Sequence, residues 1–436
     1  MKTLRMAMLA TLLLTACDFD VPDLNRPGLD TLQNPTPSAV QALATGLLIG
    51  ARKGVTERVG LVVEWGILGR EALVLTPSDP RFVNELLQGS LDPGSNNFGG
   101  NFWVIPYSNI RGANLLLHAL DNPSLVAFTA AQKEATRGFA KTIQALDYLQ
   151  VVNSHDANGA ALNVDVPLGQ VAPIVTSTDQ IFTFIENLLD DAKTRLSAGG
   201  ATFPFPLGTG FAGFDTPPTF LKFNRALRAR VAVYHQKYAD ALTAIGESFI
   251  DTSLPFKPDL GTFHAFGAGS GDTPNVLNTS DILCHPSTVT EAEAGDRRVA
   301  AKVKTLTTPV TLSNHGSSYG FTLYPNSDSP IPIIRNEELI LLRAEANIGL
   351  NNVGPAIADI DLIRVQSGGL AASSGLNAGN ILDELLKQKR YSLLFEGGHR
   401  WIDLRRYGRL DASHVAIDTT TDVIHAAFPI PLTEAQ

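Results

Sequence analysis

The sequence predicts a mostly α-helical domain. Antiparallel helix pairs, packed in the manner of tetratricopeptide repeats, are expected to form a right-handed superhelical scaffold that carries loop-rich and minor β segments. Three observations support this fold class. Apolar residues recur at helical spacing in several long stretches. Small alanines in neighbouring stretches let two helices approach closely, as in tetratricopeptide-like pairs. Stretches rich in Gly, Pro, Asn and Ser separate the helices and are typical of loops.

The chain is expected to begin its fold with two helices and a loop. Residues 36–49 place apolar residues on one face, and Pro37 suits the first turn. Residues 57–75 continue as an apolar stretch around Trp65, which favours a second helix. Residues 76–101 are dense in Gly, Asn, Pro and Asp, so we expect loops there. Long loops on a rigid scaffold often carry recognition.

Amphipathic stretches then build the helical repeats expected over residues 102–250. The expected helices cover residues 102–120, 130–152, 178–196, 220–238 and 239–250. Ser177 or Thr178 can cap the helix over 178–196. In that helix Glu186, Asp190 and Lys193 are expected to face outward, because the apolar stripe lies on the other face.

Residues 335–408 predict a further helix pair and a C-terminal helix. Leu339, Leu342 and Ala346 fall at helical spacing, and Pro355 suits the first turn of the next helix. Another helix is expected from about Asn380 to Gly397, followed by the aromatic and charged segment HRWIDLRRYG. Residues 251–334, between the two helical regions, lose helical periodicity and are expected to form loops and small strands.

The N-terminus has the features of a bacterial lipoprotein signal. Lys2 and Arg5 precede a short apolar segment that ends in Leu-Thr-Ala-Cys17. This pattern predicts a signal peptide over residues 1–16 and a lipid anchor, palmitate included, on Cys17. The alternative is an ordinary secretory signal with a chance cysteine. Residues 17–35 are acidic and contain proline, so we expect an extended tether.

Three segments carry a resemblance to a known family. LLRAEANIGL, AIADIDLIRVQSG and LLFEGGHRWIDLRRYG resemble the C-terminal signature of the SusD/RagB family, and FPIPLTEAQ (residues 428–436) resembles its C-terminal strand-like segment. The resemblance implies one SusD-like domain over residues 36–436, with the ligand-binding region in residues 251–334. The sequence departs from the family at Gln388 and Ser392, where the family often carries carboxylates.

The resemblance also implies a function and a location. Members are outer-membrane nutrient-binding lipoproteins, so we expect a lipid-anchored, surface-exposed protein that binds an oligosaccharide or a peptide. Its partner would be a SusC/RagA-like TonB-dependent barrel, to which it delivers the ligand. The alternative is a tetratricopeptide-like scaffold lipoprotein that binds another protein, which would have no small-ligand pocket.

Candidate ligand contacts are sought in the loops. A glycan site needs aromatic rings on which sugars stack and planar polar groups that pair with hydroxyls, whereas a peptide site needs a groove or exposed backbone. The candidates are Asp79, Arg81, Asn96, Phe98, Asn314, Tyr319, Phe321 and Tyr324. Each ring could instead pack within its own loop. Because the chain has only three tryptophans, a tryptophan-lined starch platform is not evident.

No catalytic motif is present, so the chain is not expected to be an enzyme. It lacks GxSxG, GxxxxGK[ST] and HExxH, and its histidines show no metal-ligand spacing, so no metal or cofactor is expected. A lipoprotein hydrolase would need a clustered catalytic pair. His399, Arg400 and Asp403 lie beside Arg405 and Arg406, which favours ion pairing that locks the last helix in place.

Charge and cysteine content narrow the partners further. The net charge of −9 argues against nucleic acid as a partner. Arg225, Arg228 and Arg230 therefore favour a salt-bridged scaffold face. Cys284, the only cysteine besides Cys17, is expected to be a packed thiol.

Overall fold

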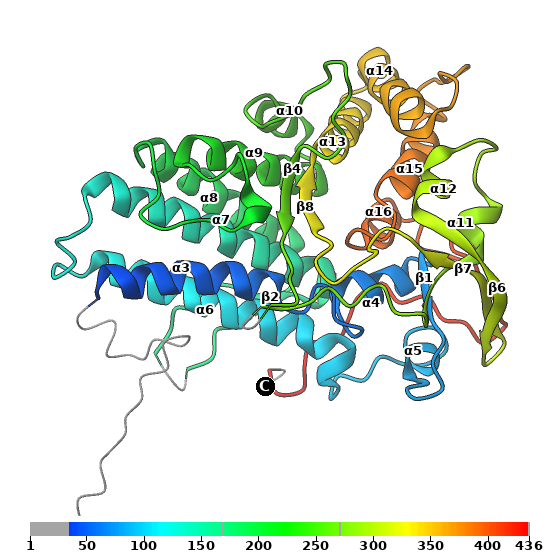
Figure 1. Cartoon of the computed structure of the whole chain (residues 1–436), viewed down its shortest axis with the longest axis horizontal. Coiled ribbons are helices and arrows are strands. Elements are labelled where there is room, and N and C mark those ends of the chain that lie inside the picture. The colour runs from blue at the N-terminus through cyan, green and yellow to red at the C-terminus, as the bar shows by residue number, and fades with distance from the viewer. Residues whose placement is uncertain (1–34, 168–169, 270–271, 435–436) are drawn as a thin grey trace, which may run out of the picture.

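The computed structural model describes residues 35–167, 170–269 and 272–434, and it confirms the mostly helical fold class (Figure 1). Fourteen α-helices occur within these ranges. They are α3 (Pro37–Arg52), α4 (Leu61–Leu68), α5 (Arg81–Asn84), α6 (Asn101–Asp121), α7 (Ala130–His155), α8 (Thr178–Ser197), α9 (Pro217–Tyr234), α10 (Tyr238–Gly246), α11 (Pro286–Thr290), α12 (Arg297–Lys302), α13 (Asn336–Gly349), α14 (Val353–Ile363), α15 (Ile381–Ser392) and α16 (His399–Arg406).

The long helices pack one on the next as a scaffold. α3 packs on α6, α6 on α7, α7 on α8, α8 on α9 and α9 on α10; α10 then meets α13, which contacts α14 and α15. Figure 1 shows α7, α8 and α9 stacked on one side and α13 to α16 on the other. α7 and α8 approach closely because Gly138 has no side chain; a Cβ there would lie 2.6 Å from Leu196 Cγ.

Within the described ranges, eight strands form three antiparallel sheets. The strands are β1 (Ala72–Val74), β2 (Ala160–Ala161), β3 (Ile174–Val175), β4 (Gly261–His264), β5 (Ile282–Cys284), β6 (Val303–Leu312), β7 (His315–Phe321) and β8 (Ile331–Arg335). Their orders are β1-β5-β7-β6, β2-β3 and β4-β8. β5 is antiparallel to both β1 and β7, so β1 and β7 run the same way and end at the same edge of the sheet. Residues 251–334 thus contain the small strands that were expected.

Three predicted helix boundaries were wrong. The apolar run 57–75 forms only the short helix α4, then a turn at Arg70 with φ 53°, and then strand β1. This run is buried nearly throughout, and a fully buried stretch has no period that separates helix from strand. The helix expected over 220–238 breaks at Gln236, whose φ of 59° is left-handed. The helix expected to end at Gly397 ends at Ser392, and HRWIDLRRYG begins the separate helix α16.

The C-terminal segment is not a strand within residues 428–434. Phe428 is fully buried, its N–H donates to the carbonyl of Ser154 at 2.9 Å, and its own carbonyl accepts from Asn158 Nδ2 at 2.8 Å. The segment is held to the end of α7 by these few bonds rather than by a strand partner. The predicted signal peptide, the tether up to residue 34 and Cys17 lie outside the described residues. Within the described part of the chain, no helix is long and apolar enough to cross a membrane.

Candidate functional site

The N-terminal candidate residues form one contact group. The guanidinium of Arg81 donates to both carboxylate oxygens of Asp79, with Nε–Oδ1 at 2.8 Å and Nη2–Oδ2 at 2.7 Å. It also lies over the Phe98 ring, 4.8 Å from the centroid. Phe98 itself is fully buried, whereas Asn96 is exposed on the turn before α6. The group therefore presents a half-exposed, planar ion pair, and the Phe98 ring serves the core beneath it.

The candidates in the second loop region lie at two ends of strand β7. Asn314 is exposed at the tip of the β6–β7 hairpin, with a left-handed φ of 64°. Tyr319 is half-buried in β7, and Phe321 stacks face to face on Phe395 with ring centroids 4.1 Å apart. Tyr324 is buried, and its hydroxyl donates to the Phe395 carbonyl at 2.9 Å. Asn314 is thus separated from the others by the length of the strand.

One edge of the four-stranded sheet brings together parts of the two loop regions that carry the candidate ligand contacts. Since β1 and β7 end at this edge, the loop after β1 and the loop after β7 both start there. The segment before β5 joins them, because Asp281 accepts from the Leu75 N–H and Asn278 Nδ2 donates to the Pro325 carbonyl. A pocket of about 320 Å³ opens at this edge between Asn278, Ser280, Lys304 and Phe321. We call it the sheet-edge pocket.

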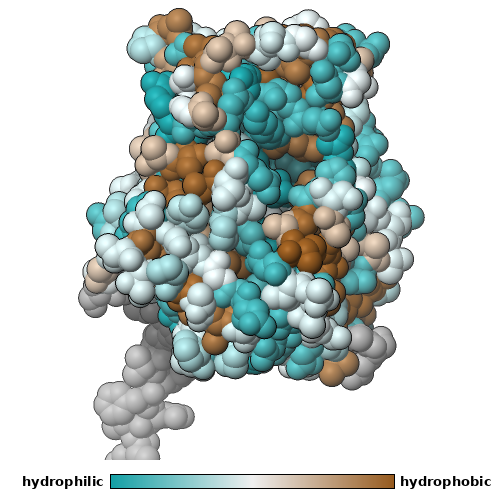
Figure 2. All heavy atoms as spheres, turned by 90° about the vertical axis from the view of Figure 1, so that its right-hand side faces the viewer, coloured by the Kyte–Doolittle hydropathy of each residue, from teal (hydrophilic) through white to brown (hydrophobic). Residues whose placement is uncertain are grey.

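A larger polar cleft lies on the other side of residues 322–324. Its volume is about 620 Å³, and Thr322 and Tyr324 line both hollows. The rim of the polar cleft carries Asp259, Arg297 and Gln366, and one wall is apolar. That wall comprises Pro258, Phe263, Leu323, Pro330 and Pro332. Figure 2 shows the side of the molecule that carries β6 and β7, where hydrophilic residues dominate between separate hydrophobic patches and the surface is hollowed.

The floor of the polar cleft is a neutralised ion network. Arg335 Nε donates to Glu396 Oε2 at 2.8 Å, and Lys302 Nζ lies 3.0 Å from Glu396 Oε1. Arg335 also pairs with Glu337. Burial alone would raise the pKa of Glu337, but Arg335 and Lys302 outweigh it and lower that pKa to about 2. The floor charges are therefore matched internally. The exposed Asp259 and Arg297 of the rim are open to a ligand, and Asp259 Oδ1 also lies 3.8 Å from Arg335 Nη1.

Sequence reasoning missed the rim residues. Asp259 precedes β4, Arg297 begins α12, and Gln366 follows α14. Arg297 Nη2 donates to the Gln366 carbonyl at 3.1 Å, which ties two of these distant segments together. No local motif marks any of the three. The one available signal was the position of Asp259 and Arg297 within residues 251–334.

The HRWIDLRRYG segment is architecture, as expected. Lys389 Nζ lies 2.8 Å from Glu345 Oε2 and 2.7 Å from Asp403 Oδ2, and Arg406 Nη2 lies 2.6 Å and 2.7 Å from the other oxygens of the same two carboxylates. All four side chains are at least nine-tenths buried. This buried charge cluster joins α13, α15 and α16. Arg400 donates to the backbone carbonyls of Gly69 and His414, which holds α16 against the turn after α4.

The three arginines of α9 are salt-bridged, which confirms the scaffold interpretation. Arg225 pairs with Asp190 and Arg230 with Glu338. Arg228 pairs with Glu186, so the prediction that Glu186 faces outward was wrong. Glu186 is buried, and it also lies 3.2 Å from both His235 Nδ1 and Lys237 Nζ, because α9 packs over this face of α8.

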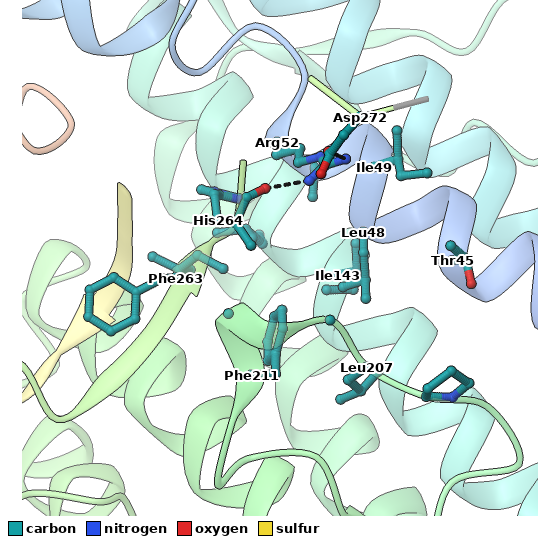
Figure 3. Close-up of a pocket in the computed structure, with 17 residues that line it drawn as sticks. Thr45, Leu48, Ile49, Arg52, Ile143, Leu207, Phe211, Phe263, His264 and Asp272 are labelled. Atoms are coloured by element: carbon teal, nitrogen blue, oxygen red, sulfur yellow. Dashed lines mark hydrogen bonds and ion pairs between the residues drawn. The ribbon is translucent and has the colours of Figure 1, made fainter. Parts of the chain in front are cut away.

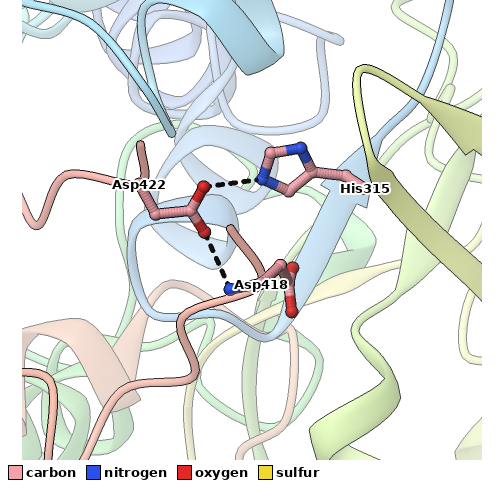
Figure 4. Close-up of side chains that lie close together, drawn as sticks. All are labelled: His315, Asp418 and Asp422. Carbon is pink, nitrogen blue, oxygen red and sulfur yellow. Dashed lines mark hydrogen bonds and ion pairs between the residues drawn. The ribbon is translucent and has the colours of Figure 1, made fainter. Parts of the chain in front are cut away.

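A histidine and two aspartates meet where the β6–β7 hairpin touches the loop 411–426 (Figure 4). His315 Nε2 lies 2.9 Å from Asp422 Oδ1, and His315 Nδ1 lies 3.0 Å from the Ser313 carbonyl. Asp422 Oδ2 accepts from the Asp418 N–H at 3.0 Å, and Asp418 Oδ2 lies 3.1 Å from His285 Nε2. The side chains that could bind a metal are thus hydrogen-bonded to one another or to nearby protein groups, and the cluster fastens the loop to the sheet.

Cys284 is a packed thiol, as expected. It lies in the centre of the four-stranded sheet in β5 and is fully buried. Burial raises the pKa of its thiol to about 12, so a nucleophilic thiolate is not formed there near neutral pH.

The geometry defines a class of protein: a tetratricopeptide-like helical scaffold that supports two polar hollows built from loops and short strands. The model of the SusD family matches residues 313–429. The match covers the C-terminal region whose segments resemble the SusD/RagB family, and it supports that resemblance. No curated protein sequence matches the chain.

Solved structures with the SusD fold resemble nearly the whole chain. A SusD-superfamily protein from Bacteroides vulgatus aligns with a TM-score of 0.69 at 17% identity, over 92% of this chain and 96% of that one. A laminarin-binding SusD-like protein aligns with a TM-score of 0.65 at 18% identity, over 91% and 96%. Surface glycan-binding protein A from Bacteroides uniformis aligns with a TM-score of 0.63 at 17% identity, over 87% and 91%. At these identities the likeness is one of fold.

Proposed function

We propose that this protein is a lipid-anchored surface protein that binds an oligosaccharide in the polar cleft and delivers it to a SusC/RagA-like TonB-dependent barrel. The observation that carries the proposal is the composition of the cleft. An apolar wall of Phe263 and prolines faces a rim of carboxylate, guanidinium and amide groups. Sugars present both an apolar C–H face and a set of hydroxyls, so this combination suits a glycan.

The neutral floor of the cleft supports an uncharged polar ligand. Arg335, Lys302, Glu337 and Glu396 satisfy one another, so the floor does not demand a ligand of either sign. The exposed rim adds one cation and one anion, Arg297 and Asp259. Two relatives of the same fold are described as laminarin-binding and glycan-binding, which supports a glycan over a peptide here. The planar Asp79–Arg81 pair stays a prediction as a further ligand contact.

Binding can be measured on the soluble chain that begins at Asp18, with a glycan array and a peptide array run in parallel. Arg297→Ala is expected to weaken binding of the best glycan by at least about tenfold, because a hydrogen bond from a charged group contributes about 1.5–3 kcal/mol. Arg111→Ala is the matched control, since Arg111 is an exposed arginine on α6 outside the cleft. Binding of peptides alone, or equal glycan affinities for the two variants, would contradict the proposed site.

The anchor and the delivery step need their own test. In this proposal signal peptidase cleaves before Cys17, the cysteine is lipidated, and residues 36–436 form a single SusD-like domain at the outer membrane. Labelled palmitate should enter the wild-type protein and not Cys17→Ser. The native lipoprotein, pulled down from detergent-solubilised membranes, should bring a TonB-dependent barrel with it. If no barrel co-purifies, delivery to a transporter is wrong even where glycan binding holds. No covalent step is part of the proposal.

A further inference from the structure

A mostly apolar pocket of about 450 Å³ lies between α3, α7, β4 and the loop before α9 (Figure 3). Its apolar walls are formed by Leu48, Ile49, Ile143, Leu207, Phe211 and Ile333. In Figure 3, Leu48 and Ile143 lie opposite Phe211 and Leu207. An apolar cavity of about 150 Å³ holds benzene, so this pocket has room for a group larger than one ring. Phe263 of β4 contributes to this pocket and to the polar cleft.

The charged groups gather at one end of the pocket, and the exposed Thr45 adds one hydroxyl at the other end. Arg52 Nη2 donates to Asp272 Oδ1 at 2.6 Å, and Nη1 donates to the Ala265 carbonyl. Arg52 Nε is buried and has no hydrogen-bond partner among the residues that the structure describes. The imidazole of His264, beside it in the lining, likewise makes no hydrogen bond within the described ranges. Buried donors are normally paired, so Arg52 Nε points to a missing partner, and the half-buried His264 imidazole lies beside it.

The chemistry of the pocket limits what that partner can be. A bare sugar ring would turn most of its hydroxyls towards aliphatic and aromatic side chains, where an unpaired hydroxyl is costly. A charged group also fits poorly. Asp272 already neutralises Arg52, and burial together with the nearby Arg52 lowers the pKa of His264 to about 3, so the imidazole is uncharged at neutral pH. What remains is an uncharged apolar body with one hydrogen-bond acceptor.

We propose that this pocket binds an uncharged aryl-acyl group, such as an aromatic ester. The ring would lie among Leu48, Ile143 and Phe211, and the ester carbonyl would accept a hydrogen bond at the end that carries Arg52 Nε and His264. This site differs from the polar cleft in its ligand chemistry and does not rest on the proposed glycan binding.

Isothermal titration of the soluble chain with three probes tests the proposal. The probes are methyl cinnamate, propylbenzene, which lacks the carbonyl, and sodium cinnamate, which carries a charge. We expect saturable binding of one methyl cinnamate per chain, with propylbenzene about 2–10-fold weaker because it loses one hydrogen bond. Cinnamate should bind at least about tenfold more weakly than the ester, since its charge would be buried without a free counter-ion.

Variants distinguish binding of the ester in the pocket from non-specific binding elsewhere on the protein. Ile49 is 45% exposed at the edge of the pocket, so Ile49→Trp should fold and obstruct it, lowering affinity for the ester at least about tenfold. Val126→Trp is the matched control, because Val126 is 86% exposed and lies outside the pocket. His264→Leu should weaken binding of the ester and leave propylbenzene binding unchanged. The proposal fails if the ester shows no saturable binding, if Ile49→Trp binds it like wild type, or if cinnamate binds as tightly as the ester.

Discussion

The buried charge cluster of α13, α15 and α16 allows a sharp prediction about stability. In Lys389→Met, Glu345 and Asp403 lose one of the two cations that they share, while Arg406 still bridges them. Removing one partner from a buried ion pair costs about 3–5 kcal/mol, because a charge is left in a place without water. Since Arg406 remains, we expect the lower end, about 3 kcal/mol. With a urea m-value of about 3 kcal/mol/M, the unfolding midpoint should fall by about 1 M.

The same variant should show a definite pH dependence. Burial alone would raise the pKa values of Glu345 and Asp403, but Lys389 and Arg406 hold both below their usual range. Carboxylates with lowered pKa stabilise the fold above their unfolded pKa of about 4, and this contribution is lost as the pH falls through the folded value. Without Lys389 the folded pKa of one carboxylate rises, so its protonation relieves the variant. The deficit against wild type should therefore be largest at pH 7 and shrink at pH 4.5.

Urea unfolding followed by tryptophan fluorescence measures both effects, because Trp401 is buried in α16. Lys387→Met is the matched control on the same helix. Lys387 and its partner Glu293 are each about one-third exposed, so their pair is worth less than about 1 kcal/mol. In the double variant Lys389→Met/Asp403→Asn, the buried positive and negative charges are again equal in number. At least half of the fall in the urea unfolding midpoint should therefore be recovered. Equal midpoints for Lys389→Met and Lys387→Met at pH 7, or a larger deficit at pH 4.5, would refute the argument.

Three further predictions follow from single contacts. Burial, with a smaller effect of Glu85, raises the pKa of Glu64 well above its usual value, so the wild type loses stability as the pH rises above the unfolded pKa. The free energy of unfolding of Glu64→Gln should therefore rise relative to wild type between pH 5 and pH 8, by up to about 1.4 kcal/mol per pH unit. A difference in urea unfolding that does not change with pH would contradict this. A Cβ at Gly349 would lie 2.2 Å from the ring of Tyr238, so Gly349→Ala should cost about 1–3 kcal/mol in thermal or urea unfolding, whereas Gly246→Ala, which meets nothing within 4 Å, should not destabilise. Asp422→Asn should speed hydrogen exchange in residues 411–426, because the ion pair to the β6–β7 hairpin is lost; unchanged exchange there would show that the loop is held by other bonds.

Helix positions were predictable because their information is local. In α8 the apolar stripe and the Ser177 cap lie within one stretch, and the structure confirms both. Glu186 shows the limit of such reasoning. It lies on α8, but its partners Arg228 and His235 come from α9 and the turn after it, and periodicity within one helix carries no information about charges on another. The run 57–75 fails for the opposite reason: it is buried on all sides and so has no periodicity to read.

The residues of the proposed binding site were harder to predict because the hollows are built from distant segments. Aromatic residues in loops were reasonable candidates, yet Phe98 and Tyr324 are buried, since large rings are the side chains that anchor loops to the scaffold. Arg81 and Asp79 pair as neighbours in sequence, which is why a local search could find them. Asp259, Arg297 and Gln366 meet at one rim only after β4, α12 and α14 are assembled.

The two hollows argued for ligand binding differ in how their charges are arranged, and this difference bears on selectivity. In the polar cleft the ion pairs form the floor, so they fix the shape of the site and leave exposed polar groups at the rim. In the apolar pocket the ion pair of Arg52 and Asp272 lies at one end, and the walls are mostly apolar side chains. A ligand that carries an aryl ester on a sugar could use both chemistries, because Phe263 lines both spaces. A plain sugar or a plain ester should occupy only one of them, so competition between the two probes would reveal whether the spaces communicate.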